Sequence, residues 1–159
     1  MMKILTSIFL GTFLTIGSAA IAAGSAADPV VGTWKLNAAK STFSAGPALK
    51  SQTRIYSQSA QGITLNMTTV GADGKEIGSQ TTYHLDGKDY PVTGIAAYDS
   101  LSGKQVDSNT AKFTLKKGGK AVGTTSRTVS KDGKTLTSKV KMTTANGEKS
   151  ESVMVFDKQ

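Results

Sequence analysis

The sequence predicts an all-β protein in which about eight to ten antiparallel strands follow one another as an up-and-down meander and close into a barrel. Turn dipeptides recur at regular intervals, and the residues between them alternate between apolar and polar. After the N-terminal apolar run, no window sustains the period of an amphipathic helix. Closure is favoured because an open meander of this length leaves two long unpaired edges. A flattened sandwich would show nearly the same alternation and stays an alternative.

The N-terminal segment, residues 1–23, has the three parts of a secretory signal peptide. Lys3 supplies a positive charge, Ile4–Ile16 is apolar, and Ala20-Ile21-Ala22 fits the small-residue cleavage rule. A membrane anchor is the alternative, but this run reaches only about 20 Å, against roughly 30 Å of hydrocarbon. We therefore expect cleavage between about residues 22 and 27, export to a periplasm or the extracellular space, and one domain over 28–159 that does not span a membrane.

Composition restricts the class of partner. The chain has no cysteine, so packing and strand pairing must hold the domain without disulfides. It contains 17 Lys and 2 Arg against 8 Asp and 3 Glu, a formal net charge of +8. Arginine is the usual bidentate reader of phosphates and bases, so a dispersed, lysine-dominated surface argues against nucleic acid. It is typical of solubility and edge protection, while attraction to an anionic envelope surface stays an alternative.

Glycine-containing dipeptides mark the expected hairpin turns. Asp-Gly and Asn-Gly suit a two-residue hairpin turn, because its central positions need positive φ. The dipeptides are Asp73-Gly74, Asp86-Gly87, Ser102-Gly103, Gly118-Gly119, Asp132-Gly133 and Asn146-Gly147.

Alternation with a period of two places the strands between these turns. In the segment 135–144, for example, Leu136, Val140 and Met142 alternate with threonine and lysine, which predicts one core-facing and one water-facing side. The expected strands are 31–37, 52–60, 62–70, 75–85, 88–92, 95–100, 104–117 with a break left open at 107–109, 120–130, 134–144 and 149–157.

Two segments depart from simple alternation. The last strand has apolar residues on both faces, which predicts burial on both or closure against the first strand. Residues 38–50 form a long connection without strand character, in which Phe43 and Pro47 are expected to make a plug or short turn over one barrel end.

The residues Val31-Gly32-Thr33-Trp34-Lys35-Leu36 resemble the opening of the calycin superfamily, the lipocalins and fatty-acid-binding proteins. In that superfamily a Gly-x-Trp packs its indole across the base of the barrel. The ending Val155-Phe156-Asp157-Lys158 resembles the closing strand of fatty-acid-binding proteins, and segments 29–47, 88–94 and 130–136 resemble uncharacterised bacterial secreted lipocalin-like proteins. The resemblance implies a calycin-like barrel in which Gly32 and Trp34 form the structural base.

The chain also departs from the fatty-acid-binding pattern. Residues 38–50 have no room for a helix-turn-helix lid. The Arg-x-Tyr that holds a ligand carboxylate in that family is replaced by Met154 and Phe156, which cannot donate to a carboxylate. A fatty acid is therefore in doubt as the specific ligand.

The only two arginines, Arg54 and Arg127, are the best candidates for a polar ligand anchor, because arginine is preferred where a planar fork meets a carboxylate or phosphate. Surface ion pairing is nevertheless the favoured interpretation of both. Tyrosines at 56, 83, 90 and 98 would add hydroxyls, or would simply lie at the rim. The candidate ligand-binding residues are Arg54, Arg127, Tyr83, Phe113 and Met142, in a cavity expected to be lined by Ile63, Leu65, Phe113, Leu136 and Met142.

Catalysis, metal binding and cofactors find little support. The only histidine, His84, lies opposite the Tyr83 and Leu85 face and is expected in solvent without a catalytic partner. One histidine and no cysteine make no transition-metal cluster, and turn formation explains the aspartates at 73, 86, 89 and 132. We expect no catalytic residues, no metal and no cofactor.

The leading hypothesis is an exported, monomeric barrel that binds a small, largely apolar molecule in its interior. The alternative is a non-catalytic cell-envelope structural or interaction module that uses a lysine-rich surface. Salt distinguishes the two, because surface binding to an anionic partner fades as ionic strength rises and apolar uptake does not.

Overall fold

The computed structural model describes residues 27–44, 48–143 and 146–159. The predicted signal peptide, most of its cleavage window and Pro47 lie outside these residues. Within the described ranges, no helix has the length and apolar character needed to cross a membrane.

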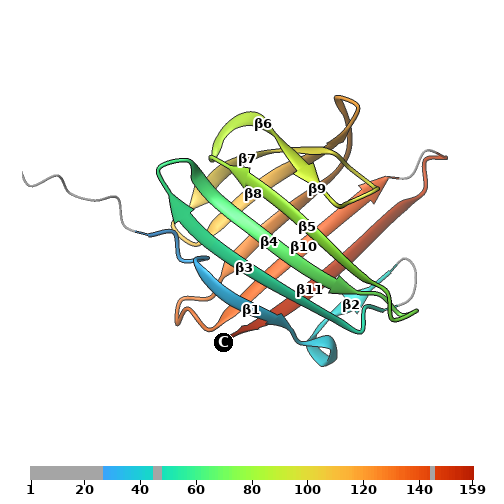
Figure 1. The fold of residues 1–159 in the computed structure, drawn as a ribbon, viewed down its shortest axis with the longest axis horizontal. Helices are drawn as coiled ribbons and strands as arrows, with labels where there is room; N and C mark the ends of the chain where they lie inside the picture. The colour runs from blue at the N-terminus through green and yellow to red at the C-terminus, as the bar shows by residue number, and fades with distance from the viewer. Residues whose placement is uncertain (1–26, 45–47, 144–145) are drawn as a thin grey trace, which may run out of the picture.

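The described chain is almost entirely antiparallel β-structure (Figure 1). A short 3-10 helix, η1 (Ala38–Lys40), is its one helical element. The strands are β1 (Gly32–Leu36), β2 (Thr42–Phe43), β3 (Ser51–Ser59), β4 (Gly62–Val70), β5 (Glu76–Tyr83), β6 (Asp86–Thr93), β7 (Ser100–Asp107), β8 (Thr110–Lys117), β9 (Lys120–Val129), β10 (Thr135–Thr143) and β11 (Lys149–Lys158).

The barrel closes because β1 pairs on both sides. Trp34 lies opposite Arg54 of β3 on one side and opposite Lys158 of β11 on the other. From β3 to β11 each strand pairs with the next, so β1 and β3–β11 form a closed ring (Figure 1). The two-residue β2 pairs farther along β11, next to the stretch that β1 occupies. Closure confirms the predicted barrel and excludes the flattened sandwich.

The ends of the barrel differ in what covers them. At one end of the barrel, residues 27–31 lie beside the turns at 60–61 and 108–109. We call this the N-terminal end. The opposite end, which we call the far end, contains the turns at 71–75 and 118–119. Side chains facing inward near the N-terminal end are buried, such as Ile63 and Leu136. Near the far end, Met67, Val140 and Met142 are only partly buried.

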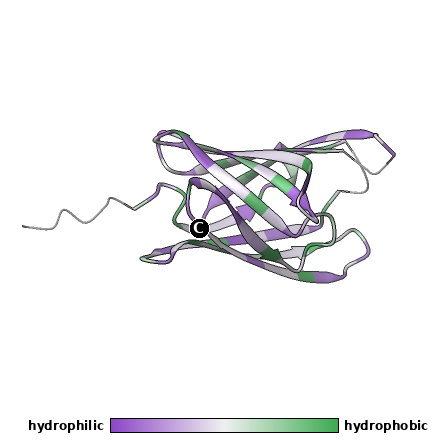
Figure 2. Cartoon of the chain, turned by 90° about the horizontal axis from the view of Figure 1, so that it is seen from above, coloured by the Kyte–Doolittle hydropathy of each residue, from purple (hydrophilic) through white to green (hydrophobic). Residues whose placement is uncertain are grey.

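The alternation of the sequence is the inside–outside alternation of the barrel, and hydrophobic and hydrophilic residues accordingly alternate along the strands in Figure 2. On β8, Ala111, Phe113 and Leu115 are buried between the outward Lys112 and Thr114. On β11, Met154 and Phe156 are buried inside, while Val153 and Val155 on the outer face are partly buried. The core comprises Val30, Trp34, Tyr56, Ile63, Tyr83, Val92, Leu101, Ala111, Phe113, Leu115, Val129, Leu136, Met154 and Phe156.

Most turn predictions are confirmed. Gly118 and Gly119, both with positive φ, form the two-residue turn between Lys117 and Lys120. Turns also occur around Asp73-Gly74, Asp132-Gly133 and Gly147, and the break left open near 107–109 separates β7 from β8.

Two turn predictions are wrong. Ser102-Gly103 lies inside β7, where the absence of a Cβ at Gly103 makes room for the ring of Phe113. Asp86-Gly87 begins β6 rather than forming the turn, and the strand is irregular there, with a positive φ at Gly87. Asp-Gly favours a local backbone shape that serves a bulge as well as a hairpin.

The predicted strand 95–100 is wrong apart from its last residue. Residues 94–99 form an irregular connection between β6 and β7. Ile95 and Tyr98 are apolar because they pack against the barrel core from this connection, and not because they belong to a strand.

The connection 38–50 has more structure than expected, with η1 and β2 inside it. Asn37 caps η1 by accepting a hydrogen bond from the Lys40 N–H at 3.2 Å. Phe43 is partly buried against the core, and its strand lies on the edge of β11.

Adding a methyl group at Gly103 tests the packing of the Phe113 ring against β7. A Cβ there would lie 2.5 Å from the Phe113 ring, so we expect Gly103→Ala to destabilise the fold by about 1–3 kcal/mol through overpacking. The matched control is Gly78→Ala on β5, where a Cβ meets nothing within 4 Å. Urea unfolding should show that the control is neutral or slightly stabilised, and equal losses in both variants would contradict this account.

Candidate binding site

The barrel interior holds a small cavity at the level of the two arginines, with a volume of about 80 Å³. This equals the share of two to three water molecules at roughly 30 Å³ each, and small-molecule pockets usually measure about 300–1,000 Å³. The lining residues are Arg54, Tyr56, Leu65, Met67, Tyr83, Tyr98, Leu101, Phe113, Leu115, Thr125, Arg127, Ser138 and Val140.

This lining corrects the expectation of an apolar cavity. Of the five residues expected around it, only Leu65 and Phe113 line it. Ile63 and Leu136 are buried in the packed core instead. Because residues from β3 and β9 place two guanidinium groups in the wall, the cavity has both charged and apolar lining residues.

Arg54 lies inside the barrel and is only 7% exposed, so surface pairing is wrong for it. Its Nε donates to Gln52 Oε1 at 2.9 Å, and its guanidinium stacks 4.2 Å from the centre of the Phe156 ring. Nη2 lies 4.0 Å from the sulfur of Met154. Among the described residues, no carboxylate forms an ion pair with this side chain. Arg54 is therefore a buried positive charge held by neutral groups.

Arg127 is also buried, at 4% exposure, but it has an acidic partner. Its Nη1 and Nη2 donate to the two carboxylate oxygens of Asp28 at 3.0 and 2.7 Å. Asp28 belongs to the segment that precedes β1, and that segment is fixed by further bonds from the Asp28 N–H to Gln58 and from the Val30 N–H to the Asp28 carboxylate. The Nε of Arg127 is buried and has no hydrogen-bond partner among the described residues.

The Asp28–Arg127 pair changes the titration of both groups. Burial alone would raise the pKa of Asp28, but the hydrogen bonds and charge of Arg127, with the Val30 N–H, outweigh it and hold that pKa below its ordinary value. Burial likewise opposes the charged form of Arg127, and Asp28 with the neighbouring tyrosines raises its pKa.

Three tyrosines complete the polar part of the wall. Burial raises the pKa of Tyr83 and of Tyr98, so both phenols stay neutral and able to donate a hydrogen bond. Tyr83 packs edge-to-face on Phe113, with ring centres 5.3 Å apart. Tyr56 lies 5.9 Å from the Arg127 guanidinium. Tyr90 does not reach the cavity, because its hydroxyl bonds to Asp86 outside.

The structure brings four of the five candidate ligand residues together, namely Arg54, Arg127, Tyr83 and Phe113. Met142 does not line this cavity and lies farther toward the far end, against Gly123. His84 is exposed as expected and lies beside the ring of Tyr90.

Gly32 and Trp34 lie at the start of β1. Trp34 is fully buried and its indole N–H donates to the Val30 carbonyl at 2.7 Å, which ties the N-terminal segment to the barrel. Lys158 covers the ring, with Nζ 5.1 Å from its centre, and passes 3.0 Å from where a Gly32 Cβ would lie.

Sequence reasoning missed Asp28 and Gln52. Alternation along β3 would have placed Gln52 on the same face as Arg54. Asp28 lies outside any strand, so no periodic pattern pointed to its pairing with Arg127.

These observations define the class of the fold: a closed, up-and-down antiparallel barrel with two arginines in its interior. No protein-family model matches the chain. No curated protein matches it either. One solved structure found in the comparison is the siderocalin Ex-FABP, described as functioning through dual ligand specificities, with 9% identity over 82% of this chain and 74% of that chain and a TM-score of 0.37. The class therefore rests on the strand topology alone.

Asp28→Asn tests the buried ion pair. We expect a loss of about 3 kcal/mol of unfolding free energy near neutral pH, because Arg127 is left buried without its counter-charge. The folded pKa of Asp28 lies below its ordinary 3.8, so the stabilisation is present above that value and is lost as pH falls through the lowered pKa. The unfolding free energies of wild type and Asp28→Asn should therefore become equal in acid. The control is Asp89→Asn, which breaks an exposed pair with Lys116; a pH-independent difference for Asp28→Asn would contradict the assignment.

Proposed function

We propose that the protein is an exported, non-catalytic, monomeric carrier that binds a small molecule with an acidic head group inside the barrel, at Arg54. The observation that carries the proposal is the buried Arg54 guanidinium on the cavity wall without a carboxylate partner among the described residues.

Electrostatics favours an acidic head group. A buried cation is costly unless an anion pairs with it, and Phe156 and Gln52 compensate that cost only in part. The barrel itself supplies a carboxylate to its other arginine, Arg127, from Asp28. A carboxylate or similar anion from outside would complete the equivalent pair at Arg54, with the neutral Tyr83 and Tyr98 able to donate additional hydrogen bonds.

The remaining wall favours a ligand that also has an apolar part. Leu65, Met67 and Val140 also line the cavity with aliphatic side chains. Along β10, the next inward residue beyond Val140 is Met142, and these side chains become less buried toward the far end. The cavity of about 80 Å³ suits the head group only, so the apolar part would extend past Val140 and Met142 and displace these partly buried side chains.

Octanoate and octanol test the head-group requirement. We expect measurable binding of octanoate by isothermal titration calorimetry and at least about tenfold weaker binding of octanol, since a charge-assisted bond to an arginine is worth about 1.5–3 kcal/mol. Equal binding of the two ligands, or binding of neither, would contradict the proposal.

Arg54→Met should separate binding from stability. The variant should lose octanoate binding, while its unfolding free energy stays within about 1 kcal/mol of wild type, because removing an unpaired buried charge offsets the lost Gln52 bond. Lys35→Met on the exposed face of β1 is the matched control and should keep octanoate binding. Retained binding in Arg54→Met would refute the assignment of the site.

Export is tested by the mass of the protein recovered from its host. We expect an intact mass that corresponds to cleavage between about residues 22 and 27, which leaves Asp28 in the mature chain to pair with Arg127. A mass that includes residues 1–20 would contradict export by this signal.

A further inference from the structure

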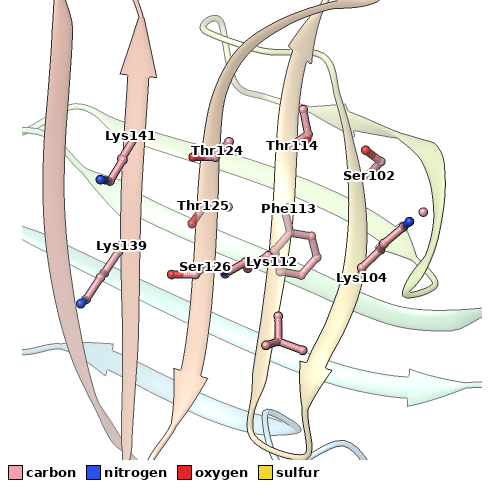
Figure 3. Close-up of a pocket in the computed structure, with 12 residues that line it drawn as sticks. Ser102, Lys104, Lys112, Phe113, Thr114, Thr124, Thr125, Ser126, Lys139 and Lys141 are labelled. Carbon is pink, nitrogen blue, oxygen red and sulfur yellow. The ribbon is translucent and has the colours of Figure 1, made fainter.

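The outer face of the barrel carries a second concave feature, which shares only Phe113 and Thr125 with the lining of the interior cavity. A hollow of about 660 Å³ lies across β7, β8, β9 and β10. Figure 3 shows Lys139 and Lys141 on one side of its floor and Lys104 on the other, with hydroxyl side chains between them. We call this feature the basic groove, defined by Lys104, Lys112, Lys139 and Lys141 with Ser102, Thr114, Thr124 and Ser126.

Strand register arranges these side chains in two parallel rows. In the first row each residue lies opposite the next on the neighbouring strand: Lys104, Lys112, Ser126 and Lys139. The second row lies two residues away on the same face: Ser102, Thr114, Thr124 and Lys141. Because strands lie about 4.8 Å apart, each row extends over roughly 14 Å.

The first row concentrates positive charge without neutralising it. Lys104 and Lys112 lie directly opposite each other, an arrangement of like charges that destabilises a sheet. Asp86 lies opposite Lys104 on its other side, but its carboxylate accepts from Tyr90 and lies 3.6 Å from the Lys88 ammonium. Within the described part of the chain, only Lys141 of the four lysines forms an ion pair, an exposed one with Glu151 at 3.3 Å. The opposed lysines of the first row cost the sheet some stability.

The floor of the groove provides hydroxyl groups between the lysines. Ser102, Thr114, Thr124 and Ser126 make no side-chain hydrogen bond to another described residue, so their donors and acceptors are available to a ligand. Lysine ammonium groups meet single, spaced anionic groups as point charges, whereas arginine forks suit planar bidentate ones. Spaced anionic groups separated by hydroxyls are the chemistry of an acidic sugar chain.

We propose that the basic groove binds an extended anionic polysaccharide, with its carboxylates on Lys104, Lys112 and Lys139 and its hydroxyls on the serine and threonine floor. Other polyanions fit less well. Phe113 is the one aromatic residue among the residues that line the groove, and at 6% exposure its ring offers little surface for a nucleic-acid base to stack on. Val106, at 53% exposure, is the one exposed aliphatic side chain among the lining residues, too little apolar surface to insert into a lipid bilayer.

Polygalacturonate and neutral dextran test this proposal on the folded mature protein. We expect binding to polygalacturonate that weakens as salt rises past physiological strength, and no binding to dextran. The triple variant K104Q/K112Q/K139Q should bind polygalacturonate about tenfold more weakly, because three exposed charge contacts are lost. Thermal unfolding should show that this variant is folded, and relief of the Lys104–Lys112 repulsion should leave it at least as stable as wild type.

The matched control is K35Q/K120Q/K131Q, which removes the same charge from exposed lysines outside the groove. It should keep wild-type affinity. Equal losses in the two triple variants would show attraction to net charge only and would overturn the proposal. So would binding to phosphatidylglycerol vesicles through the same three lysines without binding to polygalacturonate. Octanoate binding by K104Q/K112Q/K139Q measures the interior site at Arg54 separately from the basic groove.

Discussion

The structure depends on the double pairing of β1, with β3 on one side and β11 on the other. This strand has five residues, yet it converts a meander with two free edges into a closed barrel. Trp34 lies at the centre of that pairing, between Arg54 and Lys158, and its indole holds the N-terminal segment through the Val30 carbonyl. The same segment carries Asp28 to Arg127. Closure, the cover of the N-terminal end and the neutralisation of one arginine are therefore parts of one arrangement.

The contrast between the two arginines follows from this arrangement. The chain uses lysine almost everywhere, and its two arginines both face the interior. Asp28 neutralises Arg127 from within the chain, whereas Arg54 has a ring, an amide and a thioether around it. An apolar residue of similar size at position 54 would fill the same space without the cost of a buried charge. An external anion that pairs with Arg54 would offset the cost of this buried charge.

Much of the fold was predictable because a barrel repeats one rule on every strand. The face assignments of Phe113, Leu136 and Met154 follow from a period of two, and β-branched and aromatic residues mark the strands that carry them. The glycines were less informative about where the turns lie. At Gly118-Gly119 it serves a turn, but at Gly103 it serves the packing of a ring from the neighbouring strand, and the sequence pattern is the same in both places.

The site was only partly predictable, for a related reason. Arginine stood out by its rarity, and β3 and β9 both place it inward. Its carboxylate partner did not stand out, because Asp28 comes from an irregular segment whose position depends on the closed barrel. The size of the cavity could not be inferred either, since it depends on how large side chains from facing strands fill the interior.

The most direct test of the central claim is an NMR titration that follows the side-chain Nε–H signals of arginine, of which the chain has only two. The Arg54→Met variant assigns the two signals, because its spectrum lacks the Arg54 signal. On addition of octanoate we predict that the Arg54 signal shifts with saturation, while the Arg127 signal, held by Asp28, stays in place. An unmoved Arg54 signal at octanoate concentrations that occupy the protein would contradict the account, because the acid would then bind elsewhere.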